Sequence, residues 1–125
     1  MIKSTKNQLM VSQNPFQGND LKVLCVCSVG ILRSPTLANW LHKTYEYNTR
    51  SCGSSEDFAL IPVSEALVNW ADMIVFVDQK SYNETFPNGH GDNTVVVLNI
   101  PDNFNYMEEE LLEQIKFQYQ QIETN

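Results

Sequence analysis

The sequence predicts an α/β domain of three layers, in which helices cover both faces of a four-stranded parallel sheet. Short apolar segments rich in β-branched residues alternate along the chain with amphipathic segments of helical period. The apolar segments are nearly uninterrupted, as is typical of strands that are buried on both faces of a parallel sheet. The length of 125 residues suits one such domain with a single sheet.

The domain is expected to span residues 21–125, after a polar extension at residues 1–20. That extension contains Pro15 and Gly18 and shows no sustained hydrophobic period. It also lacks the apolar block of a secretory signal. We therefore expect it to be disordered or partly draped on the domain.

The first strand is predicted at residues 21–27, because their sequence, LKVLCVC, is almost entirely apolar. A helix is predicted over residues 34–47, where Ser34 suits the N-cap and Pro35 the first helical position. The apolar stripe of this helix consists of Leu37, Trp40, Leu41 and Tyr45.

The middle of the chain contains weaker signals. Residues 49–52 are a candidate second strand, which Gly53 would end. A second helix is predicted over residues 62–70, with Ser64 as its possible cap. One face of this helix carries Ala66, Leu67 and Trp70.

Two further strands are predicted at residues 73–77 (MIVFV) and 94–98 (TVVVL), with a short helix over residues 78–86 between them. A final amphipathic helix is predicted over residues 107–122, and its acidic residues 108–110 lie favourably at its positive end. Its inward face is expected to contain Leu111, Leu112, Ile115, Tyr119 and Ile122.

The composition argues against several classes of function. A net charge of −7, from 15 acidic and 8 basic side chains, disfavours binding to nucleic acid or to an acidic membrane surface. No apolar run approaches the roughly 18–20 residues needed to span a bilayer. Three cysteines are too few for a disulfide framework and indicate a reducing, cytoplasmic setting. His42 and His90 have no partner at metal-ligand spacing and are interpreted as solvated or packed residues. No metal and no other cofactor is expected.

The segment that carries chemistry joins the first strand to the first helix. Ligands of open parallel sheets bind beyond the carboxyl ends of the strands, and a loop there can turn its N–H groups toward one point above a helix N-terminus. Gly30 relaxes the steric limits on such a turn, and the guanidinium of Arg33 suits two oxygens of a phosphate. The residues predicted to bind phosphate are Ser28, Val29, Gly30, Ile31, Leu32, Arg33 and Ser34.

Cys27 lies at the base of this predicted anion site. The loop amides, the helix dipole and Arg33 all favour its thiolate over its thiol, and the hydroxyl of Ser34 can add a hydrogen bond to the sulfur. A thiolate nucleophile beneath a bound phosphate predicts covalent phosphoryl transfer. Cys25 and Cys52 are interpreted as packing residues, and a redox role for either is left open.

The segment CVCSVGILRSPTLANWL resembles the C-x5-R-S-P signature of the low-molecular-weight protein tyrosine phosphatases. The chain resembles in particular a short intracellular branch of that family, the predicted protein tyrosine phosphatases. Residues 50–54, 70–78 and 100–102 and the tail NYMEEELLEQI also resemble family segments, so the resemblance covers about residues 21–122. It implies a sheet wound as in flavodoxin and the hydrolysis of phosphotyrosine-type monoesters through a phosphocysteine.

Asp102 is the candidate general acid. It follows Pro101 and the fourth predicted strand, so we expect it on a loop at the same edge of the sheet as Cys27. The resemblance likewise places the family's general acid in this Pro-Asp segment. A phenolate needs a proton to leave, and the resulting carboxylate can then activate water. The resemblance also puts aromatic residues at the pocket mouth, here Phe104 and Tyr106, although these side chains can equally anchor the loop in the core.

The chain departs from the family pattern at three positions near the site. Gly30 stands where relatives have an asparagine that braces the loop through a serine corresponding to Ser51, so we expect weaker bracing here. Leu32 stands in place of a second loop cysteine, and Asn103 in place of a proline after the general acid. A catalytically weak or inactive module that binds phosphate or a phosphorylated partner is therefore the main alternative.

Two other classes share a strand-end cysteine followed by a loop. A phosphocysteine carrier would take phosphate from a partner protein, but it does not need Arg33 at the sixth position after Cys27. A thiol-coupled arsenate reductase would need two further cysteines downstream, and none follows Cys52. The expected partner is thus a phosphorylated protein or a small phosphomonoester, and the sequence predicts neither its identity nor the oligomeric state.

Overall fold

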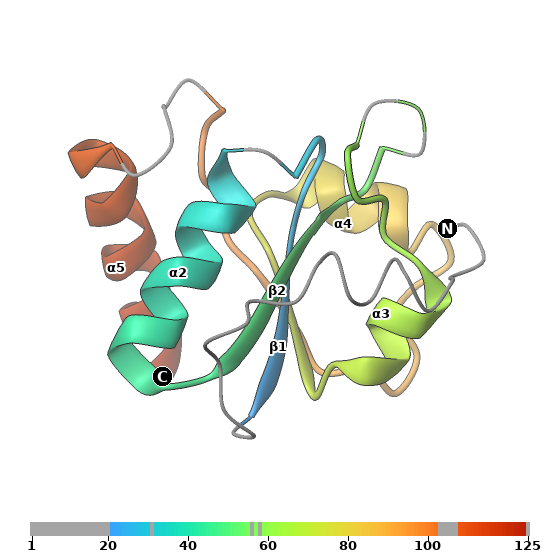
Figure 1. Ribbon diagram of the computed structural model, residues 1–125, viewed down its shortest axis with the longest axis horizontal. Helices are drawn as coiled ribbons and strands as arrows, with labels where there is room; N and C mark the ends of the chain where they lie inside the picture. The colour runs from blue at the N-terminus through green and yellow to red at the C-terminus, as the bar shows by residue number, and fades with distance from the viewer. Residues whose placement is uncertain (1–20, 31, 56, 58, 103–107, 125) are drawn as a thin grey trace.

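The computed structural model describes residues 21–124, apart from residues 31, 56, 58 and 103–107. Within these residues, four parallel strands form one sheet in the order β2-β1-β3-β4 (Figure 1). The strands are β1 (Lys22–Cys27), β2 (Asn48–Gly53), β3 (Met73–Phe76) and β4 (Val95–Val97). The predicted α/β architecture and its flavodoxin-like winding are therefore confirmed.

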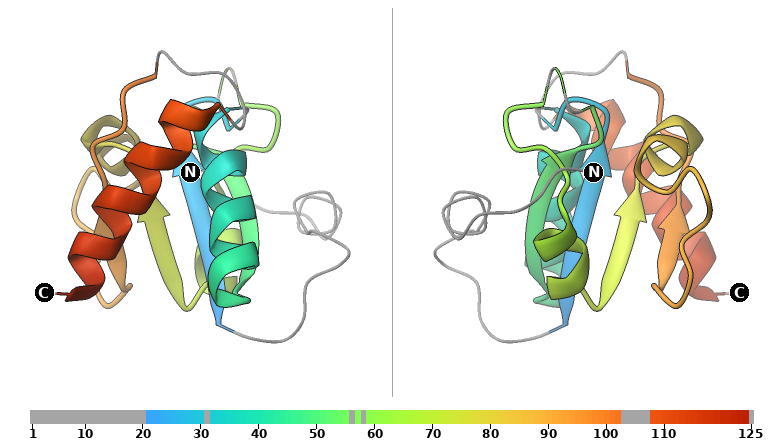
Figure 2. Two further views of the ribbon diagram at one scale, coloured as in Figure 1. Left: turned by 90° about the vertical axis from the view of Figure 1, so that its left-hand side faces the viewer. Right: turned by 90° about the vertical axis from the view of Figure 1, so that its right-hand side faces the viewer.

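Helices cover both faces of this sheet, which makes the three layers that the sequence predicts. One face carries α2 (Arg33–Tyr45) and α5 (Glu109–Thr124) (Figure 2). The other carries α3 (Glu65–Trp70) and α4 (Gln79–Thr85). No helix in the described part of the chain is long and apolar enough to cross a membrane.

The sheet contributes to two hydrophobic cores, because side chains alternate between its faces along each strand. Cys25 and Cys27 of β1 belong to the core beneath α2 and α5, whereas Leu24 and, from β2, Cys52 belong to the core beneath α3 and α4. Residues 23–26 are completely buried, as expected for an apolar strand at the centre of a parallel sheet. The two edge strands are more polar or more exposed: β2 reads NTRSCG, and β4 is half-buried.

The carboxyl ends of the strands meet at one edge of the sheet. Cys27 pairs with Gly53 of β2, and Val26 pairs with Phe76 of β3, which in turn pairs with Val97 of β4. The segments that follow the strands therefore lie together at this edge, which is uppermost in Figure 1. These segments include the loop after β1 and the Pro-Asp segment after β4.

The start of α2 differs from the prediction. The helix begins at Arg33, its N-cap is Leu32, and no side chain caps it. Ser34 is the second residue of the helix instead of its cap, and Pro35 is the third instead of the first. The physical reason is that the completely buried hydroxyl of Ser34 lies against the sulfur of Cys27 and is not free to accept a backbone N–H.

The two helices on the other face begin with the side-chain caps that short helices need. The hydroxyl of Ser64 accepts a hydrogen bond from the amide of Leu67, which confirms the predicted cap of α3. Pro62 lies outside that helix, contrary to the prediction, because it forms a parallel bridge to Gly53 at the end of β2. Asp78 caps α4 by accepting from the amide of Ser81, so α4 also begins one residue later than predicted.

The last helix packs through part of its predicted inward face. Leu111, Ile115 and Tyr119 are buried and Leu112 is half-buried against the same core, but Ile122 is 42% exposed and was wrongly placed inside. Ile122 is exposed because Tyr119 is the last residue of α5 that packs in the core under α2 and α5. The predicted extension at residues 1–20 lies outside the described residues.

Candidate active site

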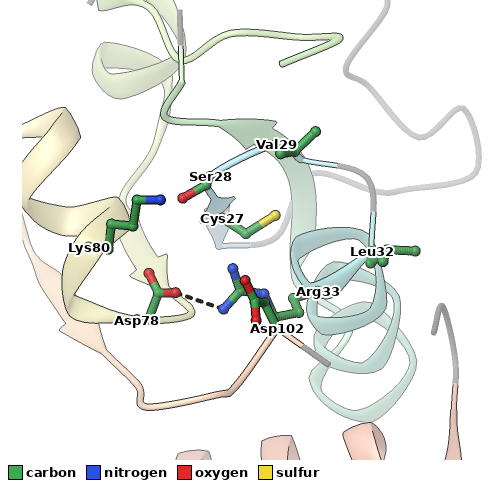
Figure 3. Close-up of a pocket in the computed structure, with 8 residues that line it drawn as sticks. All are labelled: Cys27, Ser28, Val29, Leu32, Arg33, Asp78, Lys80 and Asp102. Atoms are coloured by element: carbon green, nitrogen blue, oxygen red, sulfur yellow. Dashed lines mark hydrogen bonds and ion pairs between the residues drawn. The ribbon is translucent and has the colours of Figure 1, made fainter. Parts of the chain in front are cut away.

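A pocket of about 380 Å³ opens at the carboxyl edge of the sheet (Figure 3). It brings together the three predicted catalytic residues, Cys27 from β1, Arg33 from α2 and Asp102 from the segment after β4. Cys27 and Arg33 lie at the two ends of one loop, whereas Asp102 is far from both in the sequence and reaches the pocket because β4 belongs to the same parallel sheet. The described residues that line the pocket are Cys27, Ser28, Val29, Leu32, Arg33, Asp78, Lys80 and Asp102.

Two polar groups, one amide and one hydroxyl, contact the sulfur of Cys27 at the base of the pocket. The backbone N–H of Gly30 donates to the sulfur at 3.0 Å, and the hydroxyl oxygen of Ser34 lies 3.2 Å from it. In the thiol form the S–H can donate to Ser34, whose own hydroxyl donates to the carbonyl of Cys52 at 3.4 Å. When the thiol ionises, the Ser34 hydroxyl can turn and donate to the sulfur instead. Both groups can thus stabilise a thiolate on Cys27, a residue that is only 3% exposed.

The loop after Cys27 rests directly on the backbone at the end of β2. Gly30 has a φ of +81°, and a Cβ atom placed on it would lie 2.8 Å from the nitrogen of Gly53 and 2.9 Å from the carbonyl carbon of Cys52. A Cβ atom on Gly53 would in turn lie 2.7 Å from the backbone of Val29. Contacts this short exclude a side chain at either position, so two glycines let the loop and the strand touch.

Two backbone hydrogen bonds hold the same contact. The amide of Ser54 donates to the carbonyl of Cys27 at 2.8 Å, and the amide of Ser55 donates to the carbonyl of Ser28 at 2.9 Å. The predicted support residue, Ser51, lies beside Cys25 in the register, two residues before Gly53. Its support of the loop stays a prediction, and the contacts found here come from the residues after it. A glycine at the end of β2, followed by two serines, was the sequence signal for them.

Replacing Gly30 with alanine is expected to displace the loop. The new Cβ would overlap backbone atoms that cannot move without disturbing β2, and the positive φ would add strain. We expect the free energy of unfolding to fall by about 1–3 kcal/mol and phosphate binding to be lost. Thermal melting and calorimetric titration with inorganic phosphate measure both effects. Gly89→Ala is a matched control, since Gly89 also has a positive φ but no atom within 4 Å of the added Cβ. If Gly30→Ala behaved like this control, the tight contact would have no role.

Arg33 is fixed by two partners on one end of its guanidinium. Its Nη1 atom donates to Oδ2 of Asp78 at 2.7 Å and to the carbonyl oxygen of Ile100 at 2.7 Å. These bonds use both hydrogens of Nη1 and leave the N–H groups of Nε and Nη2 for a ligand. Those remaining groups have the planar fork geometry that can bind two oxygens of one anion.

Asp78 is a pocket residue that the sequence did not predict. Burial alone would raise its pKa, but the backbone and side chain of Ser81 and the guanidinium of Arg33 outweigh burial and hold the pKa below its ordinary value. Asp78 therefore remains a carboxylate at neutral pH, both capping α4 and orienting Arg33. Its place directly after β3, at the shared carboxyl edge, was the available signal.

Asp102 is exposed and lines the pocket. The backbone that leads to it continues the sheet beyond β4, since Leu98 donates to the carbonyl of Phe76 and Ile100 donates to that of Val77, both at 2.8 Å. The carbonyl of Ile100 also holds Arg33, so the arginine fixes the chain two residues before the predicted acid. Three further predicted site residues lie outside the described residues: Ile31, Phe104 and Tyr106.

Apolar side chains and a second cation form the rim of the pocket. Val29 and Leu32 were predicted to contribute only their backbone amides to phosphate binding. Their side chains, which are 38% and 39% exposed, also line the pocket. Lys80, in the first turn of α4, extends toward the pocket from the other side (Figure 3). The pocket therefore combines apolar side chains at its opening with two cations, Arg33 and Lys80, and two carboxylates, Asp78 and Asp102.

The other two cysteines lie where their thiols are inert. Burial raises the pKa of both Cys25 and Cys52 far above its ordinary value, and the nearby Cys27 adds to the effect. Cys52 belongs to the core on the opposite face of the sheet from Cys27. Both residues thus fit the packing role predicted for them. Among the described residues, no group of three or more His, Cys, Asp or Glu side chains is arranged to hold a metal ion.

Comparisons with known proteins support the fold. A scan of the sequence against models of protein families found no match, and neither did a search of curated proteins. Among solved structures, the chain is similar to Wzb of Vibrio vulnificus, determined in complex with benzylphosphonate, with a TM-score of 0.59 and 18% sequence identity. The similarity covers 78% of this chain and 91% of that one. The two proteins therefore share the α/β fold described above.

Proposed function

We propose that this protein hydrolyses phosphomonoesters of phenols through a phosphocysteine intermediate on Cys27. The single observation that supports the proposal is the environment of the Cys27 sulfur. The amide of Gly30 lies 3.0 Å from the sulfur, the hydroxyl of Ser34 lies 3.2 Å from it, and the oriented guanidinium of Arg33 lines the same pocket. This arrangement stabilises a thiolate and offers donors to the oxygens of a phosphate at the same place.

In the first step, the thiolate of Cys27 attacks phosphorus and the bond from phosphorus to the phenolic oxygen breaks. Asp102, protonated at this stage, gives its proton to the leaving oxygen, so a neutral phenol departs. The loop amides and the Nε and Nη2 groups of Arg33 hold the three remaining oxygens as charge shifts onto them. The products of this step are the phenol and phosphocysteine.

In the second step, water attacks the phosphocysteine. The carboxylate of Asp102 accepts a proton from that water, and the bond between sulfur and phosphorus breaks to release inorganic phosphate. The sulfur leaves as a thiolate, which the amide of Gly30 and the hydroxyl of Ser34 stabilise again. Asp102 returns to its protonated form, and the cycle consumes only the ester and water.

The nature of the pocket supports an aromatic leaving group. Val29 and Leu32 present apolar surface above the sulfur, which suits a phenyl ring better than a sugar. Benzylphosphonate, the compound in the Wzb complex, combines an aromatic ring with a phosphonate, the same two parts that this pocket suits. Membership of the low-molecular-weight phosphatases, action on phosphorylated proteins or small phosphomonoesters, and a cytoplasmic location are parts of the same proposal.

The test is hydrolysis of p-nitrophenyl phosphate in the presence of EDTA. We expect steady turnover without divalent ions, because the loop and Arg33 supply the positive charge. Rapid acid quenching of the reaction should trap phosphate on Cys27, identified by mass spectrometry. If Cys27 became phosphorylated but inorganic phosphate was not released continuously, the protein would be a phosphocysteine carrier. If the protein bound phosphate but showed neither phosphorylation of Cys27 nor release of phosphate, it would be a binding module. Either result would overturn the proposed hydrolysis.

Replacing Asp102 with asparagine is expected to lower kcat by about 10²-fold for phenyl phosphate, whose leaving group needs a proton. The loss should be smaller for p-nitrophenyl phosphate, because nitrophenolate leaves readily without one. The measurement is the dependence of kcat on the pKa of the leaving phenol. Asp92→Asn removes a charge from an exposed position outside the pocket and serves as the control. Equal activity of Asp102→Asn and wild type on both esters would remove Asp102 from the mechanism.

A further inference from the structure

Glu84, on α4, contacts the phosphate-binding loop from a third element of the fold. Its Oε1 atom accepts a hydrogen bond from the hydroxyl of Ser28 at 3.1 Å and another from the hydroxyl of Ser54 at 3.0 Å. Ser28 directly follows the nucleophile Cys27, and Ser54 directly follows β2. One carboxylate oxygen therefore connects the first residue of the loop to the strand end on which the loop rests.

The two hydrogen bonds complete a ring with the backbone. Residues 27–28 are already joined to residues 54–55 by two amide–carbonyl bonds of 2.8 and 2.9 Å. Glu84 joins the same two segments through their side chains. With both connections in place, Ser28 cannot rotate about its backbone without breaking a hydrogen bond, and the direction of the amides that follow it is set.

The helix that carries Glu84 is rigid enough to act as a support. Ser81 and Thr85 of α4 are buried, Asp78 caps the helix, and Tyr82 packs edge-on against the buried ring of Phe76. Glu84 lies on the exposed side of this helix. Its carboxylate thus reaches the loop from an anchored backbone.

The charge of Glu84 works against the chemistry of the site. A carboxylate near a phosphate pocket repels the anion and disfavours the thiolate. Its contribution must therefore come from the hydrogen bonds it accepts, and a neutral acceptor of the same shape would serve as well.

We propose that Glu84 is a positioning residue, which holds the phosphate-binding loop in its binding geometry through Ser28 and Ser54. This role rests on the proposed function. Weaker bracing of the loop was expected from Gly30, which stands in place of the asparagine of relatives, and the hydrogen bonds to Glu84 add to that bracing. Glu84 does not touch the reacting atoms, since it does not line the pocket.

The test compares Glu84→Ala with Glu84→Gln, which keeps an oxygen acceptor and removes the charge. We expect Glu84→Ala to lower kcat/KM for p-nitrophenyl phosphate about 10-fold and to weaken binding of inorganic phosphate by a similar factor. Glu84→Gln should recover most of the loss and bind phosphate at least as tightly as wild type. Glu113→Ala is the matched control, because Glu113 is an exposed carboxylate on α5, which covers the opposite face of the sheet.

A double-substitution cycle separates this role from a general loss of stability. Ser28→Ala and Glu84→Ala should each give the same loss, and the double variant should be no worse than either, with melting temperatures within a few degrees of wild type. Additive losses, or a Glu84→Gln variant as impaired as Glu84→Ala, would overturn the proposal.

Phosphate binding keeps this test independent of turnover. It is measured as protection of Cys27 from alkylation by iodoacetate. If wild type binds phosphate but hydrolyses nothing, the proposed function fails while Glu84 is still judged by the protection assay. If phosphate protects Glu84→Ala as well as wild type, the inference about Glu84 fails alone. If phosphate does not protect wild type, no anion site exists there and both fail.

Discussion

Replacing Cys27 with serine is expected to lower kcat for p-nitrophenyl phosphate by at least about 10³-fold, with phosphate binding retained. The amide at 3.0 Å and the hydroxyl at 3.2 Å from the sulfur can stabilise a thiolate, but they cannot ionise an alcohol, which is a far weaker acid. The serine oxygen also reaches less far from Cα, so it lies farther from a phosphorus atom held by the loop. The loop amides and Arg33 are unchanged, so the anion still binds.

The measurement is steady-state turnover together with calorimetric titration of phosphate. Retained binding shows that the variant is folded and that only the nucleophile is missing. Cys25→Ala is the matched control, because Cys25 lies on the same face of the same strand but is completely buried. It is expected to lose some stability and to keep its kcat. Near-normal turnover by Cys27→Ser would rule out the phosphocysteine mechanism.

Replacing Arg33 with lysine is expected to lower kcat/KM on the order of 10³-fold. The guanidinium serves two purposes at once: Nη1 binds Asp78 and Ile100, and the rest of the group is left for the phosphate. A lysine ammonium is a single point of charge and cannot meet both sets of partners. It would either leave the Asp78 carboxylate unpaired, at a cost of about 1–3 kcal/mol in stability, or fail to bind the oxygens.

A companion substitution separates these two purposes. Asp78→Asn removes the charge and leaves one accepting oxygen where the carboxylate has two, one bonded to Arg33 and the other to the amide of Ser81. We therefore expect a smaller fall in kcat/KM than for Arg33→Lys, together with a lower melting temperature. Both variants are compared by kcat/KM, phosphate affinity and melting temperature. An Arg33→Lys variant that retained the phosphate affinity of wild type would show that the fork is not the phosphate ligand.

Local sequence signals predicted the sheet and the centre of the site. The uninterrupted apolar residues of β1 and β3 identified buried parallel strands, and the parallel topology then required a site beyond their carboxyl ends. Cys27 and Arg33 could be placed in one site because they lie on a single strand–loop–helix segment. Asp102 could be added because it follows a strand of the same sheet.

What the sequence did not predict depends on contacts between distant segments. Asp78 carried only the signal of its place directly after β3, and its bond to Arg33 appears once β3 lies beside β1. The contact of Gly30 with Gly53 depends on the exact register of β1 and β2. Ser34 was wrongly predicted to be the N-cap of α2, because a serine before a proline usually is one. In the structure its hydroxyl is hydrogen-bonded to the sulfur of Cys27 instead.

The backbone contact between Gly30 and Gly53 has a thermodynamic consequence for ligand binding. A loop whose shape is set by packing and backbone hydrogen bonds loses its conformational entropy when the chain folds, before any anion arrives. Association with phosphate then requires little further ordering of the loop, so more of the contact energy appears as affinity. Because neutral backbone atoms make this contact, changes of pH or ionic strength within the folded range do not act on the contact directly.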